Sequence, residues 1–201
     1  MLTVQRTVRQ LILIIVCCCD TLAHMYTARA QPGSPSPSSL AVSCGARAAL
    51  WRALTQHGNQ AFAQQQETRA RRLYEEALGE AEALLAAAEE RVSSATISLA
   101  PMAYNTSCQN VAELARRQND TDTEGIYLYR AYERIVSVAE SLKLPAELRL
   151  ACVEPMSAAA KALIGYLMAH GLRDAACTYA ERAKAATFQV LGLTEDLAAR
   201  E

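Results

Sequence analysis

The stretch GNQAFAQQQETRARRLYEEAL, residues 58–78, decides the fold. Its small residues, Gly58 and Ala70 among them, alternate with the bulky Phe62 and Tyr74. A large side chain where two helices cross would push them apart, whereas alternating small and large side chains let helices pack closely. The pattern therefore predicts an αα-hairpin whose two helices cross at the small residues.

Apolar residues recur every three or four positions along most of the chain, the spacing of an amphipathic helix. They predict one helix over 46–65 and a second from about 67 to 93. Weaker copies of the hairpin pattern lie in 105–135 and 157–187, after about 54 and then about 52 residues. Two long helices, the one ending near residue 93 and one over 146–169, account for these long intervals.

Prolines indicate where helices begin and bend. Ala100-Pro101 and Leu144-Pro145 each predict a helix start, because proline fits the first helical turn. Pro155 lies inside the predicted 146–169 helix and should kink it there, because proline offers no N–H to the carbonyl four residues earlier.

The composition agrees with an all-α fold. Hydrophobic residues make up 51% of the 201 residues, charged residues 20% and aromatic residues 5%, and alanine supplies much of the apolar share. A β-sandwich or barrel would need more turn residues and β-branched runs. We expect about six helices in three antiparallel hairpins, forming one domain over 45–193.

The first hairpin resembles a tetratricopeptide repeat (TPR), at Gly58-Asn59, Phe62, Ala70, Tyr74 and Ala77-Leu78. The resemblance implies a right-handed α-solenoid of three degenerate repeats, similar to small uncharacterised bacterial repeat proteins; a generic six-helix bundle is the alternative. Gln65 replaces the turn glycine in the first copy. The residues expected to pack or turn the repeats are Gly58, Ala70, Tyr74, Ala77, Ala112, Asn119, Ala131, Gly171, Ala176 and Ala183.

The same resemblance implies a concave groove, lined by the first helix of each hairpin, that would hold a peptide. The groove candidates are Arg52, Asn59, Phe62, Gln109, Glu113, Arg116, Arg117, Lys161 and Met168, with Thr55, Thr106 and Gly165 beside them. Each has a structural alternative. Arg116 and Arg117 also complement a helix C-terminus, and Phe62 and Met168 would suit a core.

Catalytic motifs are missing from the sequence. The three histidines have no Ser, Cys or acid at a spacing typical of a dyad or triad, and no phosphate-binding or zinc motif occurs. The net charge of −1 offers no basic face for nucleic acid. We expect a non-enzymatic adaptor, without cofactor or metal, that binds a protein or peptide. The alternatives are a secretion-type chaperone and a small helical enzyme or ligand-binding protein.

The N-terminal region, residues 1–30, resembles a signal peptide, with the apolar run 11–19 after two arginines. That run is too short to span a bilayer, which needs about 20 apolar residues. The alternative is a mis-annotated extension upstream of Met25. The chain would be exported in the first case and cytoplasmic in the second. Residues 31–44 predict a Pro/Ser-rich linker and 194–201 a C-terminal tail.

The seven cysteines show no metal-binding spacing. We expect most of them to be small buried hydrophobic residues. Disulfides would be expected only in an exported protein. The sequence leaves the oligomeric state and the partner open.

Overall fold

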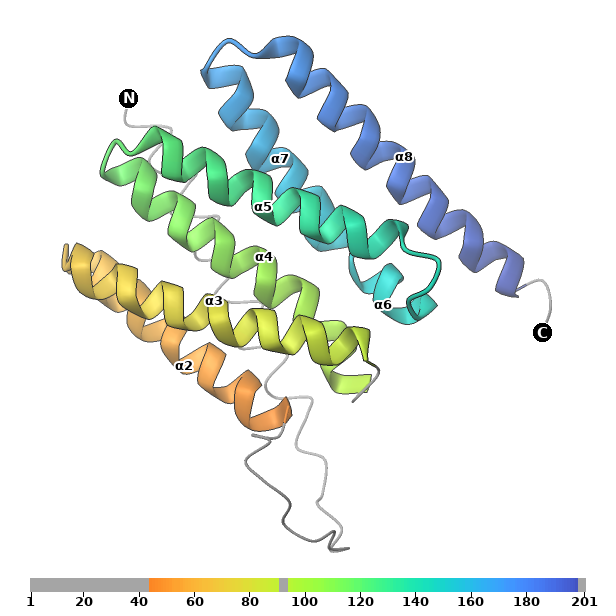
Figure 1. Cartoon of the computed structure of the whole chain (residues 1–201), viewed down its shortest axis with the longest axis horizontal. Helices are drawn as coiled ribbons and strands as arrows, with labels where there is room; N and C mark the ends of the chain where they lie inside the picture. Colours follow the sequence, from red (N-terminus) through yellow and green to blue (C-terminus); the bar gives the residue numbers. More distant parts are fainter. Residues whose placement is uncertain (1–43, 91–93, 199–201) are drawn as a thin grey trace, which may run out of the picture. The chain divides into compact units, whose positions relative to one another are not determined.

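The computed structural model describes residues 44–90 and 94–198, and this part of the chain is helical without any strand. Its six long helices are α2 (Cys44–Ala63), α3 (Glu67–Glu89), α4 (Ser94–Arg117), α5 (Thr121–Glu140), α7 (Val153–Ala169) and α8 (Arg173–Ala198); a short α6 (Ala146–Ala151) precedes α7. Figure 1 shows that α2/α3, α4/α5 and α7/α8 are antiparallel pairs. The all-α prediction with about six helices is confirmed. The predictions for residues 1–30, and for the linker as far as 43, lie outside the described residues.

The three antiparallel pairs turn in the same way. One residue in each turn has a positive φ: Gln65 at 62°, Asn119 at 58° and Gly171 at 75°. The N–H of the next residue donates to a carbonyl in the last turn of the preceding helix, with an N–O distance of 2.9 Å in each case. The pairs are Gln66 to Ala61, Asp120 to Ala115, and Leu172 to Leu167. This is the Schellman ending of a helix, which satisfies carbonyls that would otherwise lack a donor. The ending recurs at intervals of 54 and 52 residues.

Small residues at the helix crossings allow the helices of the core to pack closely. A Cβ atom on the buried Gly58 would lie 2.6 Å from the ring of Tyr74. The alanines expected between helices are all buried in the structure: Ala70, Ala77, Ala112, Ala131, Ala176 and Ala183. Since a buried alanine brings two backbones close together, these positions set the separation of the helices.

Consecutive helices pack on one another from α2 to α5, and the third pair joins them through contacts of α7 and α8 with α5. The buried Trp51 ties α2 to α4, because its Nε1 donates to Ser107 Oγ at 2.9 Å. Arginines join the second helices of the pairs. Arg134 reaches Glu89 from α5 to α3 at 2.8 Å, and Arg182 reaches Glu133 from α8 to α5 at 2.8 Å.

The proline predictions are correct in the third pair and wrong in the second. α6 begins directly after Pro145, and the helix breaks at Cys152, between α6 and α7. Pro155 cannot donate to the carbonyl of Ala151, which explains a break at this place. By contrast, α4 begins at Ser94, so Pro101 lies inside a helix instead of opening it.

Two helix ends differ from the predicted positions, and one apolar segment is long enough to be compared with a membrane span. α3 ends at Glu89, before the predicted end near residue 93, and α8 continues to Ala198, beyond the predicted domain end at 193. The segment Ala146–Ala169 is long and apolar enough to cross a membrane by length and composition. Four of its large apolar residues are fully buried against the other helices, Leu148, Met156, Leu163 and Leu167, whereas Leu150 and Met168 are exposed.

Candidate functional site

Three of the predicted groove residues make contacts between helices of the fold. Asn59 Oδ1 accepts a hydrogen bond from the Tyr74 hydroxyl at 2.9 Å, which joins α2 to α3. Arg117 Nη1 donates to the carbonyl of Phe62 at 2.8 Å, and its guanidinium lies 4.7 Å from the centre of the Phe62 ring. These three side chains are therefore engaged inside the protein and are poor candidates for contacts with a partner.

Two further groove candidates pair with each other on α4. Arg116 donates from Nε and Nη2 to the two carboxylate oxygens of Glu113, at 2.7 and 2.6 Å. These hydrogen bonds raise the pKa of Arg116 above its ordinary value. Gln109 makes a longer hydrogen bond to Asn105, at 3.3 Å. The Glu113–Arg116 pair is partly open to solvent and presents one charge of each sign.

The remaining candidates are exposed. Arg52 lies on α2, while Lys161 and Met168 lie on α7, and Met168 is 49% exposed. The structure thus brings Phe62 and Arg117 together where α2 meets α4, while Asn59 pairs with Tyr74 of α3. No contact joins Lys161 or Met168 to that group within the described residues.

Two buried polar atoms on α2 and α4 lack hydrogen-bond partners, Thr55 Oγ1 and Asn110 Nδ2. Each lies one helical turn beyond a member of the Trp51–Ser107 hydrogen bond. Because α2 and α4 run in the same direction, both atoms lie on the same side of that bond. Thr55 is a predicted groove position, whereas Asn110 is not among the predicted groove residues.

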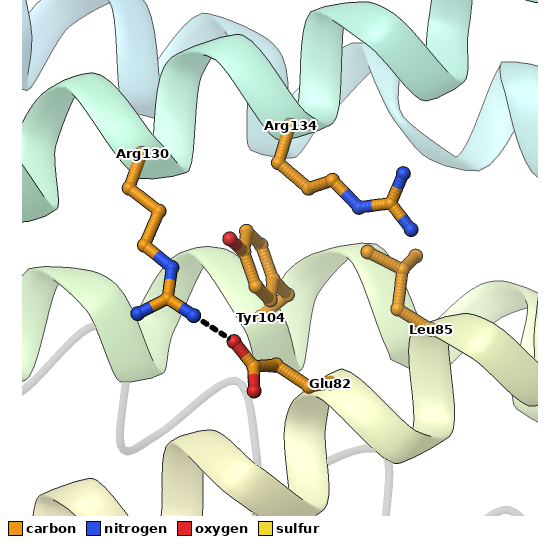
Figure 2. A pocket seen from close by; sticks show the side chains of 5 residues that line it. All are labelled: Glu82, Leu85, Tyr104, Arg130 and Arg134. Carbon is orange, nitrogen blue, oxygen red and sulfur yellow. Dashed lines mark hydrogen bonds and ion pairs between the residues drawn. The ribbon is translucent and has the colours of Figure 1, made fainter.

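A pocket of about 310 Å³ lies between α3 and α5, over α4 (Figure 2). Its lining residues are Glu82 and Leu85 from α3, Tyr104 from α4, and Arg130 and Arg134 from α5. Figure 2 shows the two arginine side chains extending from α5 on either side of the Tyr104 hydroxyl, with an ion pair between Arg130 and Glu82. None of the predicted groove residues lines this pocket.

Sequence reasoning missed the pocket because its residues come from three helices. One signal was present. Arg130 and Arg134 are four residues apart, so they project from the same face of a helix. The spacing alone does not distinguish a binding pair from two solvated arginines, since the facing residues Glu82 and Tyr104 are distant in sequence.

Burial raises the pKa of two side chains of α4 in or next to the pocket, so both are neutral over a wide pH range. It raises the pKa of the Tyr104 hydroxyl to about 12, and raises that of the Cys108 thiol, one turn further along α4, to about 12 as well. Cys152 is also buried, and its thiol pKa is raised to about 12 by burial. Cys177 is exposed, and the four cysteines of the described part are free thiols.

In residues 44–90 and 94–198, no group of three or more His, Cys, Asp or Glu side chains is arranged to hold a metal ion. Many polar side chains of this part make hydrogen bonds and ion pairs between helices, while others pair within one helix or are exposed.

In the comparison with protein families, residues 49–195 match a family described as a protein of unknown function, DUF2753. Neither curated proteins nor solved structures match the chain. The matched residues cover almost all of the six long helices. The chain therefore belongs to the DUF2753 family.

Proposed function

We propose that this protein is a non-enzymatic adaptor that binds an extended segment of a partner protein along α2 and α4. The observation that carries the proposal is the pair of unpartnered polar atoms, Thr55 Oγ1 and Asn110 Nδ2. A buried polar group without a hydrogen bond costs about 1–3 kcal/mol. A bound segment that supplied the missing hydrogen bonds would recover that free energy.

A peptide backbone has the right chemistry for both atoms. The Asn110 amide nitrogen is a donor and needs a carbonyl oxygen, whereas the Thr55 hydroxyl both donates and accepts. An extended backbone presents N–H and C=O groups about every 3.3 Å, and we expect Thr55 and Asn110 to change side-chain rotamer on binding so that either atom reaches it. The nearby Glu113–Arg116 pair would give the site a preference for charged side chains.

The proposed architecture is a right-handed solenoid of three TPR-like hairpins. Three equivalent turns, at Gln65, Asn119 and Gly171, support this arrangement, as do the small residues at the helix crossings. In such a stack the first helix of each pair would line one continuous face. The exposed Arg52 on α2 and the exposed Lys161 and Met168 on α7 would extend that face beyond α4.

The test is a selection of displayed random peptides on the full chain, followed by affinity measurements on Thr55→Val and Asn110→Leu. Each substitution removes a polar atom that has no partner, so stability should stay the same or rise by about 1 kcal/mol. Peptide affinity should fall about tenfold, the effect of losing one good hydrogen bond. A loss of binding without a loss of stability separates a binding role from a structural one.

Thr68→Val is the matched control, because Thr68 is an exposed threonine on α3. It should leave both peptide affinity and stability unchanged. If no peptide is selected, or if the selected peptides bind the Thr55 and Asn110 variants as tightly as the parent chain, the proposed face is wrong.

A further inference from the structure

The pocket between α3 and α5 presents more hydrogen-bond donors than the fold uses. A guanidinium group has five N–H donors. Arg130 pairs with Glu82 through Nη2, and Arg134 pairs with Glu89 through Nη2 at 2.8 Å. Both arginine side chains remain accessible, at 44% and 40% exposure, so further N–H groups can reach a ligand in the pocket.

The lining carries an excess of positive charge. Two guanidinium groups and one carboxylate, that of Glu82, line the pocket; Glu82 pairs with Arg130, while Arg134 pairs with Glu89, which lies outside the lining. The Tyr104 hydroxyl adds a neutral donor between the arginines, since burial raises its pKa far above neutral pH. The two guanidinium groups and the hydroxyl line the same pocket, and such donors suit the oxygens of an anion.

The rest of the lining is apolar. Leu85 is 1% exposed and Tyr104 is 4% exposed, so the leucine side chain and the aromatic ring form a closed surface beneath the arginines. The volume of about 310 Å³ is at the lower end for ligand pockets. It suits a small molecule with a few carbon atoms better than a folded partner.

We propose that this pocket binds a small organic oxyanion. The oxyanion accepts hydrogen bonds from Arg130, Arg134 and the Tyr104 hydroxyl, and its carbon part lies against Leu85. The incoming anion competes with Glu82 for Arg130, so the Glu82 carboxylate limits the affinity. The site shares no residue with the α2–α4 face, and either proposal can fail alone.

The test is isothermal titration of the full chain with succinate, with inorganic phosphate, and with chloride at matched ionic strength. We expect saturable binding of one anion per chain for succinate or phosphate and none for chloride. Tighter binding of succinate would identify a carboxylate ligand, and tighter binding of phosphate a phosphoryl ligand. The same saturation with chloride would show general charge screening and overturn the proposal.

Substitutions in the pocket should change the anion affinity in opposite directions. Loss of folding could only lower the affinity, so it cannot explain an increase. Arg134→Gln should weaken binding roughly tenfold to hundredfold, because hydrogen bonds to charged groups are strong. Tyr104→Phe keeps the ring and should weaken binding about tenfold. Glu82→Gln removes the competing carboxylate and should tighten binding severalfold.

Arg72→Gln is the control for general charge, since Arg72 is 71% exposed on α3 and pairs only with Glu76 among the ion pairs of the described part. It should not change the affinity. If Arg134→Gln and Glu82→Gln also leave the affinity at the parent value, the anion binds elsewhere and the proposal is overturned.

Discussion

A Cβ atom at Gly58 would lie 2.6 Å from two ring carbons of Tyr74, closer than side chains approach in folded proteins. The ring has little freedom to move away, because Tyr74 is 3% exposed and its hydroxyl donates to Asn59. Gly58→Ala should therefore destabilise the protein by about 1–3 kcal/mol, the usual cost of overpacking a core. Urea unfolding of the variant measures this change.

Gly79→Ala is the control for that substitution. Gly79 is exposed on α3, and a Cβ atom there would meet nothing within 4 Å. Alanine favours the helix, so this variant should gain about 0.5–1 kcal/mol. Equal effects at the two glycines would contradict a close crossing of α2 and α3.

The turn at Gln65 should become more stable with glycine. Gln65 has a φ of 62°, a conformation that costs a residue with a side chain about 1 kcal/mol or more. Gln65→Gly should raise the free energy of unfolding by about 0.5–1 kcal/mol, after the larger flexibility of the unfolded glycine chain is subtracted. Thermal unfolding monitored by circular dichroism tests this.

At Gly171, which has a φ of 75°, the opposite substitution can be made, from glycine to a residue with a side chain. Gly171→Ala should destabilise the protein by about 1 kcal/mol. Asn119→Gly should have the smallest effect of the three, since asparagine tolerates this conformation. A loss of stability in Gln65→Gly would show that the glutamine side chain stabilises its turn.

Ser107 accepts the only hydrogen bond described for the Trp51 indole N–H, and Trp51 is 2% exposed. Ser107→Ala would leave that donor buried without an acceptor, at a cost of about 1–3 kcal/mol. Ser157→Ala is the control, because Ser157 is exposed on α7. Guanidinium unfolding followed by Trp51 fluorescence should show a lower midpoint for the first variant alone.

The buried thiols predict a loss of stability at high pH. Burial raises the pKa of Cys108 and of Cys152 from an ordinary 9.0 to about 12. A group whose pKa is raised by folding contributes its full stability below its unfolded pKa, here about 9, and loses it as the pH rises towards 12. The urea midpoint should therefore fall between pH 9 and 11.

Replacing Cys108 and Cys152 together by alanine should make that fall shallower. Cys177→Ser should leave it unchanged, because Cys177 is exposed. An unchanged profile in the double variant would assign the alkaline loss to other groups, such as the buried Tyr104 hydroxyl.

The sequence predicted those parts of the fold that depend on neighbours along the chain. Helical periodicity gave the long helices, and the small residues around Gly58 indicated where α2 and α3 cross. Pro155 correctly indicated an interruption of the predicted 146–169 helix, which breaks at Cys152. Pro101 was misplaced because apolar periodicity upstream of it is weak, so the proline was the strongest local signal.

The sequence predicted the candidate site less well. A resemblance gives the positions on a face, but it does not say which side chains the fold itself uses. Asn59 accepts a hydrogen bond from Tyr74, which lies 15 positions away in the sequence. Arg117 donates to the carbonyl of Phe62, which lies 55 positions away. The pocket with Arg130 depends on similarly distant residues of α3 and α4. Such contacts leave no pattern in a single sequence.

The three Schellman turns all lie at one end of the helices, as Figure 1 shows. At this end the chain reverses within a few residues, and the N–H groups of the positive-φ residue and of the residue after it both bond back to carbonyls of the preceding helix. The other end holds the α3–α4 and α5–α6 connections. Related chains should therefore differ in length chiefly at that second end, where residues can be inserted or deleted without changing where the helices reverse.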